Sequence, residues 1–201
     1  MRVGVLASGD GSNLQAILDR LHGRGDVEVV AVGSDKAGAR ALRRAADAGV
    51  PGRVFAAADF AGRPARDAAI ADWLEERDVE LVVLAGYMQL LDPAFLARFP
   101  QRVVNVHPAL LPAFPGIGSV EQAVAYGVKV AGVTVHFVDE GVDTGPIIAQ
   151  RAIDVPEGAD AAALRLALRP LEHELLPAVV GKLARGEVTV DPGNPRHVLV
   201  A

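Results

Sequence analysis

The stretch Arg2-Val3-Gly4-Val5-Leu6-Ala7 runs straight into Ser8-Gly9-Asp10-Gly11-Ser12-Asn13, and an amphipathic segment over residues 12–21 follows without a break. The short apolar run predicts a buried strand, and the periodic apolar residues after the glycines predict a helix. A strand, a tight turn and a helix in that order are typical of the start of a βαβ unit. The N-terminus therefore indicates a parallel sheet covered by helices.

The same alternation of short apolar runs and helical patterns continues along the chain. Further strands are expected at residues 27–33, near 54, and at 80–84, 102–106, 130–138 and 147–155, and further helices at 39–48, 64–77, 93–98, 120–126 and 159–184. Pro170 and Pro177 predict a kink in the last helix, or its division in two. We predict a single α/β domain, residues 1–201, with a mostly parallel twisted sheet, helices on both faces and a C-terminal antiparallel hairpin around Asp143. Its halves are expected at 1–100 and 101–201.

Composition removes several classes of function. The net charge is −5 without a basic block, so no nucleic-acid partner is expected. The absence of cysteine excludes disulfides, thiolate zinc sites and a cysteine nucleophile. No segment approaches the ~20 apolar residues of a membrane span. We expect a soluble, cytoplasmic protein with no membrane partner, for which a homodimer stays open.

The glycine-rich turn suits a phosphate monoester. Gly9 and Gly11 let the backbone turn tightly, Ser12 and Asn13 add side-chain donors, and the helix N-terminus supplies backbone amides. A purely structural turn capped by Ser12 stays an equal alternative at this point. Asp35 follows the second strand, where a dinucleotide fold carries a ribose-binding acid, but Leu14 stands where the third glycine of that motif belongs.

Two further segments carry candidate chemistry. Leu84-Ala85-Gly86-Tyr87-Met88-Gln89-Leu90-Leu91 ends a predicted parallel strand and suits either core packing or a flat heteroaromatic ring. In Asn105-Val106-His107-Pro108, the amide and the imidazole occupy alternate positions of a strand and face the same side. Pre-organised donors of this kind stabilise a developing oxyanion, and the acid-bearing turn around Asp143 is expected nearby.

These pieces, in this order and spacing, resemble the phosphoribosylglycinamide formyltransferase family, also called glycinamide ribonucleotide transformylase. The resemblance runs from Val3 to about Gly186 and includes Gly132-Val133-Thr134-Val135-His136-Phe137-Val138, which leads to Asp143. It implies a formyltransferase-like variant of the Rossmann fold. It also implies transfer of the formyl group of 10-formyltetrahydrofolate, a co-substrate, to the amine of glycinamide ribonucleotide in purine biosynthesis, with no metal.

The resemblance assigns residues to each role. Asn105, His107 and Asp143 match the catalytic trio, in which the amide and the protonated imidazole stabilise the oxyanion and the carboxylate assists proton transfer. The ribonucleotide is expected to bind through Gly11, Ser12, Asn13 and Glu172. The folate is expected to bind through Arg63, Tyr87, Met88, Gln89, Leu90, Leu91, Val138, Glu140 and Gly141. The chain departs from the family at Val120, where members commonly have histidine, and at Pro170, which interrupts the helix leading to Glu172.

Three alternatives share part of this pattern. A 10-formyltetrahydrofolate hydrolase resembles the same core with an added N-terminal regulatory domain, whereas here the first strand is expected to begin at Arg2. A methionyl-tRNA formyltransferase is expected to carry a further C-terminal domain for tRNA. A non-enzymatic nucleotide-binding module would bind without turnover. The transferase is the preferred interpretation, and the hydrolase is the main alternative.

Overall fold

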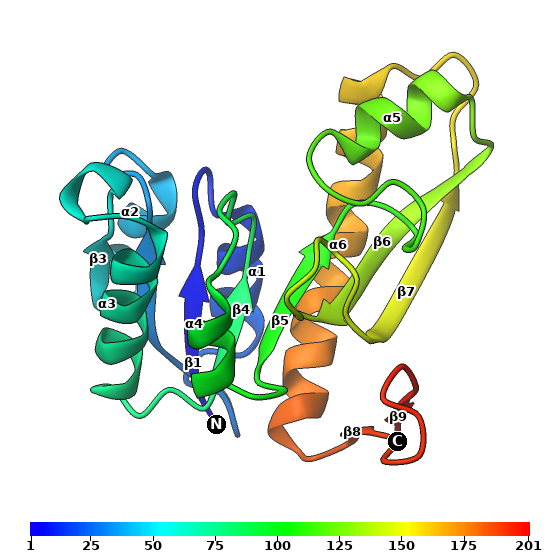
Figure 1. Cartoon of the computed structure of the whole chain (residues 1–201). Helices are drawn as coiled ribbons and strands as arrows, with labels where there is room; N and C mark the ends of the chain where they lie inside the picture. Colours follow the sequence, from blue (N-terminus) through cyan, green and yellow to red (C-terminus); the bar gives the residue numbers. More distant parts are fainter. The chain divides into compact units, whose positions relative to one another are not determined.

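A computed structural model describes the whole chain, Met1–Ala201, in two compact units, Met1–Asn105 and Val106–Ala201 (Figure 1). The unit boundary lies close to the predicted division between residues 100 and 101. Whether the two units form the single domain that the sequence suggests stays a prediction.

The first unit is a parallel sheet with interspersed helices, which confirms the predicted fold class. Its strands are β1 (Arg2–Leu6), β2 (Glu28–Ser34), β3 (Gly52–Val54), β4 (Leu81–Leu84) and the first part of β5 (Val103–His107), in the order β3-β2-β1-β4-β5. Its helices are α1 (Ser12–Arg20), α2 (Arg40–Asp47), α3 (Arg63–Glu75) and α4 (Pro93–Arg98), with a short 3-10 turn, η1 (Ala57–Asp59). All four residues of β4 are buried, because a parallel strand covered on both faces needs a continuous apolar sequence.

The second unit contains an antiparallel strand pair packed against a long helix. The pair is β6 (Val130–Phe137) with β7 (Ile147–Asp154), and the helices are α5 (Ser119–Tyr126) and α6 (Ala161–Ala184). In Figure 1, α6 runs alongside β6 and β7, and its contacts with both strands agree. The predicted hairpin around Asp143 is therefore confirmed. A second, short hairpin of β8 (Val188–Val190) and β9 (Val198–Val200) was not expected.

For the last helix the sequence predicted a kink or a division in two, and of these two outcomes the division is wrong. Pro170 and Pro177 both lie inside one continuous helix of 24 residues. Each proline removes a single backbone hydrogen bond, whereas buried leucines on both sides of Pro170, among them Leu168 and Leu175, hold the helix to the rest of its unit. Tertiary packing therefore outweighs the local breaking tendency. No helix of the protein is both long and apolar enough to cross a membrane.

The turn between β1 and α1 depends on Gly11. Gly11 is the N-cap residue of α1 and has a φ of 73°, in the left-handed region that favours glycine. A Cβ atom at this position would lie 2.7 Å from the Cβ of Ala41 and 2.8 Å from its Cα. The N-terminal residues of α2 thus approach the turn too closely for any side chain at position 11.

We expect Gly11→Ala to destabilise the protein by at least ~1–2 kcal/mol, because a left-handed φ alone costs an alanine about that much and the overlap with Ala41 adds to it. Gly9→Ala is the matched control, since a Cβ there meets nothing within 4 Å. Urea unfolding of both variants measures the effect. Equal unfolding midpoints would show that the turn tolerates a side chain at position 11.

Candidate active site

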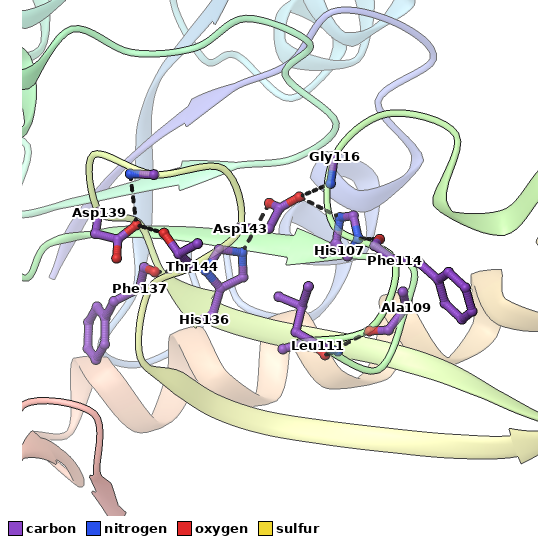
Figure 2. Close-up of polar contacts among 12 residues, drawn as sticks. His107, Ala109, Leu111, Phe114, Gly116, His136, Phe137, Asp139, Asp143 and Thr144 are labelled. Atoms are coloured by element: carbon purple, nitrogen blue, oxygen red, sulfur yellow. Dashed lines mark hydrogen bonds and ion pairs between the residues drawn. The ribbon is translucent and has the colours of Figure 1, made fainter. Parts of the chain in front are cut away.

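His107 ends β5 with both ring nitrogens facing acceptors. Its side chain is buried, with Nδ1 3.2 Å from Oδ2 of Asp143 and Nε2 2.8 Å from the carbonyl oxygen of Phe114. Figure 2 shows the ring between these two partners. A neutral imidazole carries one N–H and can donate to only one acceptor, whereas an imidazolium donates to both. The arrangement therefore fits the charged ring.

Asp143 lies between two histidine rings in the loop that joins β6 and β7. Besides its contact with His107, Oδ2 accepts a hydrogen bond of 2.8 Å from the Gly116 N–H, and Oδ1 lies 3.5 Å from Nε2 of His136 (Figure 2). His136 is buried on β6, and its Nδ1 lies 2.7 Å from the carbonyl oxygen of Phe137. One carboxylate thus joins β5, β6 and the loop that follows β5.

The surroundings of Asp143 favour its ionised form. Burial alone would raise the pKa of the carboxyl group, but hydrogen bonds from His136 and the Gly116 N–H, with the charges of His107 and His136, outweigh burial and lower the pKa to about 2. The group is consequently a carboxylate at neutral pH. A carboxylate with so low a pKa is a strong electrostatic partner for an imidazolium and a weak base.

A compact turn fixes the position of this carboxylate. Oδ1 of Asp139 accepts hydrogen bonds from the Gly141 N–H at 3.1 Å and from the Thr144 hydroxyl at 2.6 Å. A Cβ at Gly145 would lie 1.7 Å from the carbonyl oxygen of Phe137, so only glycine fits there. Asp143 itself has a φ of 53°, uncommon for a residue with a side chain. The backbone of the turn therefore aims Asp143 inward.

Polar side chains on β6 and β7 hold the segment that follows His107. The Thr134 hydroxyl donates to the Ala109 carbonyl at 2.7 Å and accepts from the Leu111 N–H at 3.1 Å. The Gln150 amide nitrogen donates to the Leu111 carbonyl at 2.9 Å. Backbone groups that would otherwise be buried without partners are satisfied in this way. Thr134 and Gln150 thus set the path of the chain leaving His107.

Asn105 lies on β5, two residues before His107, and is half-buried. In the second unit, the predicted residues other than His107 and Asp143 lie on two elements. Val138, Glu140 and Gly141 belong to the β6–β7 loop, where Val138 is half-buried and the other two are exposed. Glu172 is half-buried on α6. The ligand contacts assigned to these residues stay predictions.

The first unit carries the predicted phosphate-binding turn. The first helical hydrogen bond of α1 runs from the Gln15 N–H to the Gly11 carbonyl, so the amides of the preceding turn point out of the helix end. Asp10 is the one acid of the turn, and it forms ion pairs with Arg40 at 3.2 Å and Arg44 at 3.1 Å. The two arginines offset a negative charge that would otherwise repel an anion here.

The segment after β4 has apolar side chains outside and a polar one inside. Met88 and Leu90 are 57% and 55% exposed, whereas Gln89 between them is half-buried and Tyr87 is buried. Met88 and Leu90 thus present two apolar side chains at the surface, close together in the chain. Arg63 is exposed, with Nε 4.0 Å from the carboxylate of Asp92. The predicted folate residues of this unit thus include both exposed and buried side chains.

Sequence reasoning missed several residues that shape these sites. Phe114 and Gly116 contribute backbone groups only, so no pattern of side chains predicts their role. Arg66 and Asp67 look like ordinary surface charges of a helix, yet both are buried. The acid that a dinucleotide fold would place on a ribose, Asp35, instead accepts a 3.0 Å hydrogen bond from Gln89. A pairing of buried charges on α3 could have been suspected from two adjacent charged residues between apolar positions.

No cluster of three or more histidines or carboxylates suitable for a metal ion is present. A reaction without a metal stays a prediction from the sequence.

Comparisons with known proteins identify relatives along the whole chain. The family model described as "Formyl transferase" matches residues 1–180. Phosphoribosylglycinamide formyltransferase of Mycobacterium tuberculosis is 49% identical over 189 residues, which is 94% of this chain and 87% of the relative. The Bacillus subtilis protein of that name is 43% identical over 180 residues, covering 89% and 92%. The crystal structure of glycinamide ribonucleotide transformylase 1 from Symbiobacterium toebii has a TM-score of 0.95 at 46% identity, covering 100% of this chain and 93% of that one.

The lowered pKa of Asp143 predicts a pH-dependent contribution to stability. A group whose pKa is lower in the folded protein stabilises it above the unfolded pKa, here 3.8, and the contribution is lost as pH falls towards about 2. A shift of this size corresponds to on the order of 2 kcal/mol. Urea unfolding of the wild type and Asp143→Asn should therefore show a stability difference at pH 7 that shrinks below pH ~4. A difference that stays constant down to pH ~2.5 would contradict the assigned pKa.

Proposed function

The chain belongs to the formyl transferase family, among relatives that are phosphoribosylglycinamide formyltransferases, and from that premise we propose that it transfers the formyl group of 10-formyltetrahydrofolate to the amine of glycinamide ribonucleotide. The family resemblance read from the sequence is confirmed, and the relatives support the transferase over the hydrolase. The observation that carries the chemistry is the 3.2 Å contact between His107 and the ionised Asp143.

The chemical step is an attack by the neutral amine on the formyl carbon. The formyl oxygen becomes a tetrahedral oxyanion as the bond to nitrogen forms, and charge on that oxygen is the main cost of the step. Asn105 and the protonated His107 are assigned as its hydrogen-bond donors, because pre-organised donors act where the charge develops. The intermediate collapses as the folate nitrogen leaves with a proton, so no covalent enzyme intermediate is required.

His107 can act as a donor only if Nε2 exchanges its partner. In the resting arrangement this nitrogen faces the Phe114 carbonyl. Phe114 has a left-handed φ of 53°, which is uncommon for a residue with a side chain. A proton transfer from the attacking amine to the leaving nitrogen through a water near Asp143 completes the step. Because Asp143 is a weak base, its main contribution is to orient and charge His107.

The two substrates are assigned to different groups of residues. Gly11, Ser12 and Asn13 bind the phosphate of the ribonucleotide, supported by the outward amides of α1 and by the neutralisation of Asp10. Glu172 contacts the ribose hydroxyls. The pterin is assigned to Tyr87–Leu91 and the loop of Val138, Glu140 and Gly141, with Arg63 near the folate tail. Exposed Met88 and Leu90 support this assignment.

Two broader assignments complete the proposal. We place the reaction in the cytoplasm, in line with the sequence-based expectation. A homodimer stays a prediction, which light scattering of the purified protein would test.

The direct test mixes the purified protein with glycinamide ribonucleotide and 10-formyltetrahydrofolate and follows the deformylated folate. The control omits the ribonucleotide. Formation of tetrahydrofolate only when the amine is present supports the transferase. Release at the same rate without the amine would favour the hydrolase, and binding of both ligands without turnover would leave a binding module.

We expect Asn105→Ala to lower kcat by an amount that corresponds to about 3 kcal/mol in the barrier, as for other oxyanion donors. Steady-state kinetics with both substrates varied measures the loss. The unfolding midpoint serves as the control for folding, because Asn105 is half-buried. A change confined to the Michaelis constants would move Asn105 from catalysis to binding.

We expect Ser12→Ala to raise the KM for the ribonucleotide roughly tenfold or more, since a hydrogen bond to a charged group contributes about 1.5–3 kcal/mol. The KM for the folate should change little, because the substitution leaves the helix and its amides in place. Equal losses for both substrates would contradict separate binding residues for the phosphate.

A further inference from the structure

Arg66 and Asp67 form a buried ion pair at the start of α3. The Arg66 side chain is 4% exposed and that of Asp67 is 0% exposed. Nε and a terminal nitrogen of Arg66 both lie 2.8 Å from Oδ1 of Asp67. Burial raises the pKa of Asp67, although hydrogen bonds from Arg66 and from the Asp92 N–H act in the opposite direction. The pair thus bears a desolvation cost that its own attraction does not remove.

Stability alone is a weak reason for such a pair. Apolar residues of similar volume in place of a buried ion pair are often neutral or stabilising. What the pair supplies here is a set of directed hydrogen bonds, and all of those beyond the pair itself go to one segment, residues 88–92.

The guanidinium of Arg66 reaches the middle of this segment. One terminal nitrogen donates to Oε1 of Gln89 at 3.0 Å, and the other donates to the Leu90 carbonyl at 3.3 Å. Gln89 also forms a second hydrogen bond, in which its Nε2 donates to Oδ2 of Asp35 at 3.0 Å. Arginine can only donate and a carboxylate can only accept, so the orientation of the Gln89 amide between them is fixed.

The ends of the segment are held as well. Oδ2 of Asp67 accepts from the Asp92 N–H at 2.7 Å, and the Ser8 hydroxyl accepts from the Met88 N–H at 2.8 Å. Gln89 is turned inward by these contacts, whereas the neighbouring side chains of Met88 and Leu90 are exposed. The segment thus combines inward polar contacts with outward apolar side chains.

We propose that Arg66 and Asp67 are positioning residues, which through Gln89 and the Leu90 carbonyl hold residues 88–91 in the conformation that binds the pterin ring of the folate. The proposal rests on the proposed function, which assigns this segment to the folate. Arg66 does not touch the ligand. It raises folate affinity by keeping the competent conformation populated before binding, since apparent affinity falls in proportion to that population.

The test uses a charge-neutral replacement, Arg66→Met with Asp67→Asn, in the full chain. This double variant leaves no buried charge alone and keeps an acceptor for the Asp92 N–H, so the fold is retained. We expect the Kd for tetrahydrofolate, measured by calorimetry under reducing conditions, to rise about tenfold, which corresponds to about 1.4 kcal/mol. The Kd for glycinamide ribonucleotide and kcat at saturating folate should stay within about twofold of the wild type.

Ile70→Val is the matched control. Ile70 is fully buried on α3, and its truncation costs about 0.5–1.5 kcal/mol of stability but removes none of the hydrogen bonds from Arg66 and Asp67 to the segment. Neither Kd should change in this variant. A comparable rise of the folate Kd in Ile70→Val would show that general loosening of the unit is sufficient, and would overturn the positioning role.

Two further variants separate geometry from charge. Arg66→Lys keeps the positive charge beside Asp67 but lacks the planar fork, so it should fold normally and still bind the folate weakly. Gln89→Met removes the amide, and adding it to the Arg66→Met, Asp67→Asn background should weaken folate binding no further, because residues that act through one another are non-additive. Full folate affinity in Arg66→Lys, or additive losses, would contradict the proposal.

Failure of this inference differs from failure of the proposed function. If the wild-type protein binds tetrahydrofolate but does not formylate the ribonucleotide, the proposed transferase activity is excluded. The folate Kd values of the variants still test the positioning role. If the wild-type protein transfers the formyl group and the folate Kd is unchanged in Arg66→Met, Asp67→Asn, the positioning role is excluded. The transferase activity then stands.

Discussion

The carboxylate of Asp143 is the constraint on which the candidate active site depends. It accepts a hydrogen bond from the Gly116 N–H and lies beside the imidazoles of His107 and His136. It therefore fixes both the loop after β5 and the ring of His107. Its own position is set by a turn that tolerates no side chain at Gly145. A misplaced turn would therefore disturb the ring, its protonation and the neighbouring loop at the same time.

Electrostatics decide which role the carboxylate can fill. A general acid–base group works best when its pKa lies near the working pH, whereas Asp143 is held near 2. The contact with His107, which helps to lower this pKa, also orients the ring of His107. In the proposed reaction, charge stabilisation through His107 is consequently the larger contribution, and proton transfer is assigned to a water rather than to a basic carboxylate. These electrostatics favour the proposed stabilisation of an oxyanion over removal of a proton by Asp143.

The sequence predicts most of the regular elements but not the contacts made by backbone groups. Buried strands such as β4 are read from continuous apolar runs, which is why the predicted sheet is confirmed. The division of α6 at Pro170 was wrong because local propensity says nothing about the packing of Leu168 and Leu175. The short hairpin of β8 and β9 has only three residues per strand, too few for an alternating pattern to stand out.

Site residues divide along the same line. His107 and Asp143 were named from motifs, and the structure brings them within 3.2 Å. Phe114 and Gly116 act through a backbone carbonyl and a backbone amide, which nearly every residue type has, so no sequence motif identifies them. Arg66 and Asp67 carry a signal only after burial is known, because a charged pair near a helix start is most often solvated. In each case the sequence gives the chemistry of the residue but not its burial or its neighbours in space.

The contact between His107 and Phe114 bears on how the site would distinguish the transition state from the bound substrates. At rest, Nε2 donates to a neutral carbonyl at 2.8 Å. A neutral formyl oxygen is no better an acceptor than that carbonyl, so exchange of partners gains little when the substrates first bind. Once the formyl oxygen carries negative charge, it attracts the charged ring as an opposite charge, whereas the Phe114 carbonyl offers only a dipole. The exchange is then favourable only as the oxyanion forms, and an interaction realised only in the transition state raises kcat rather than substrate affinity.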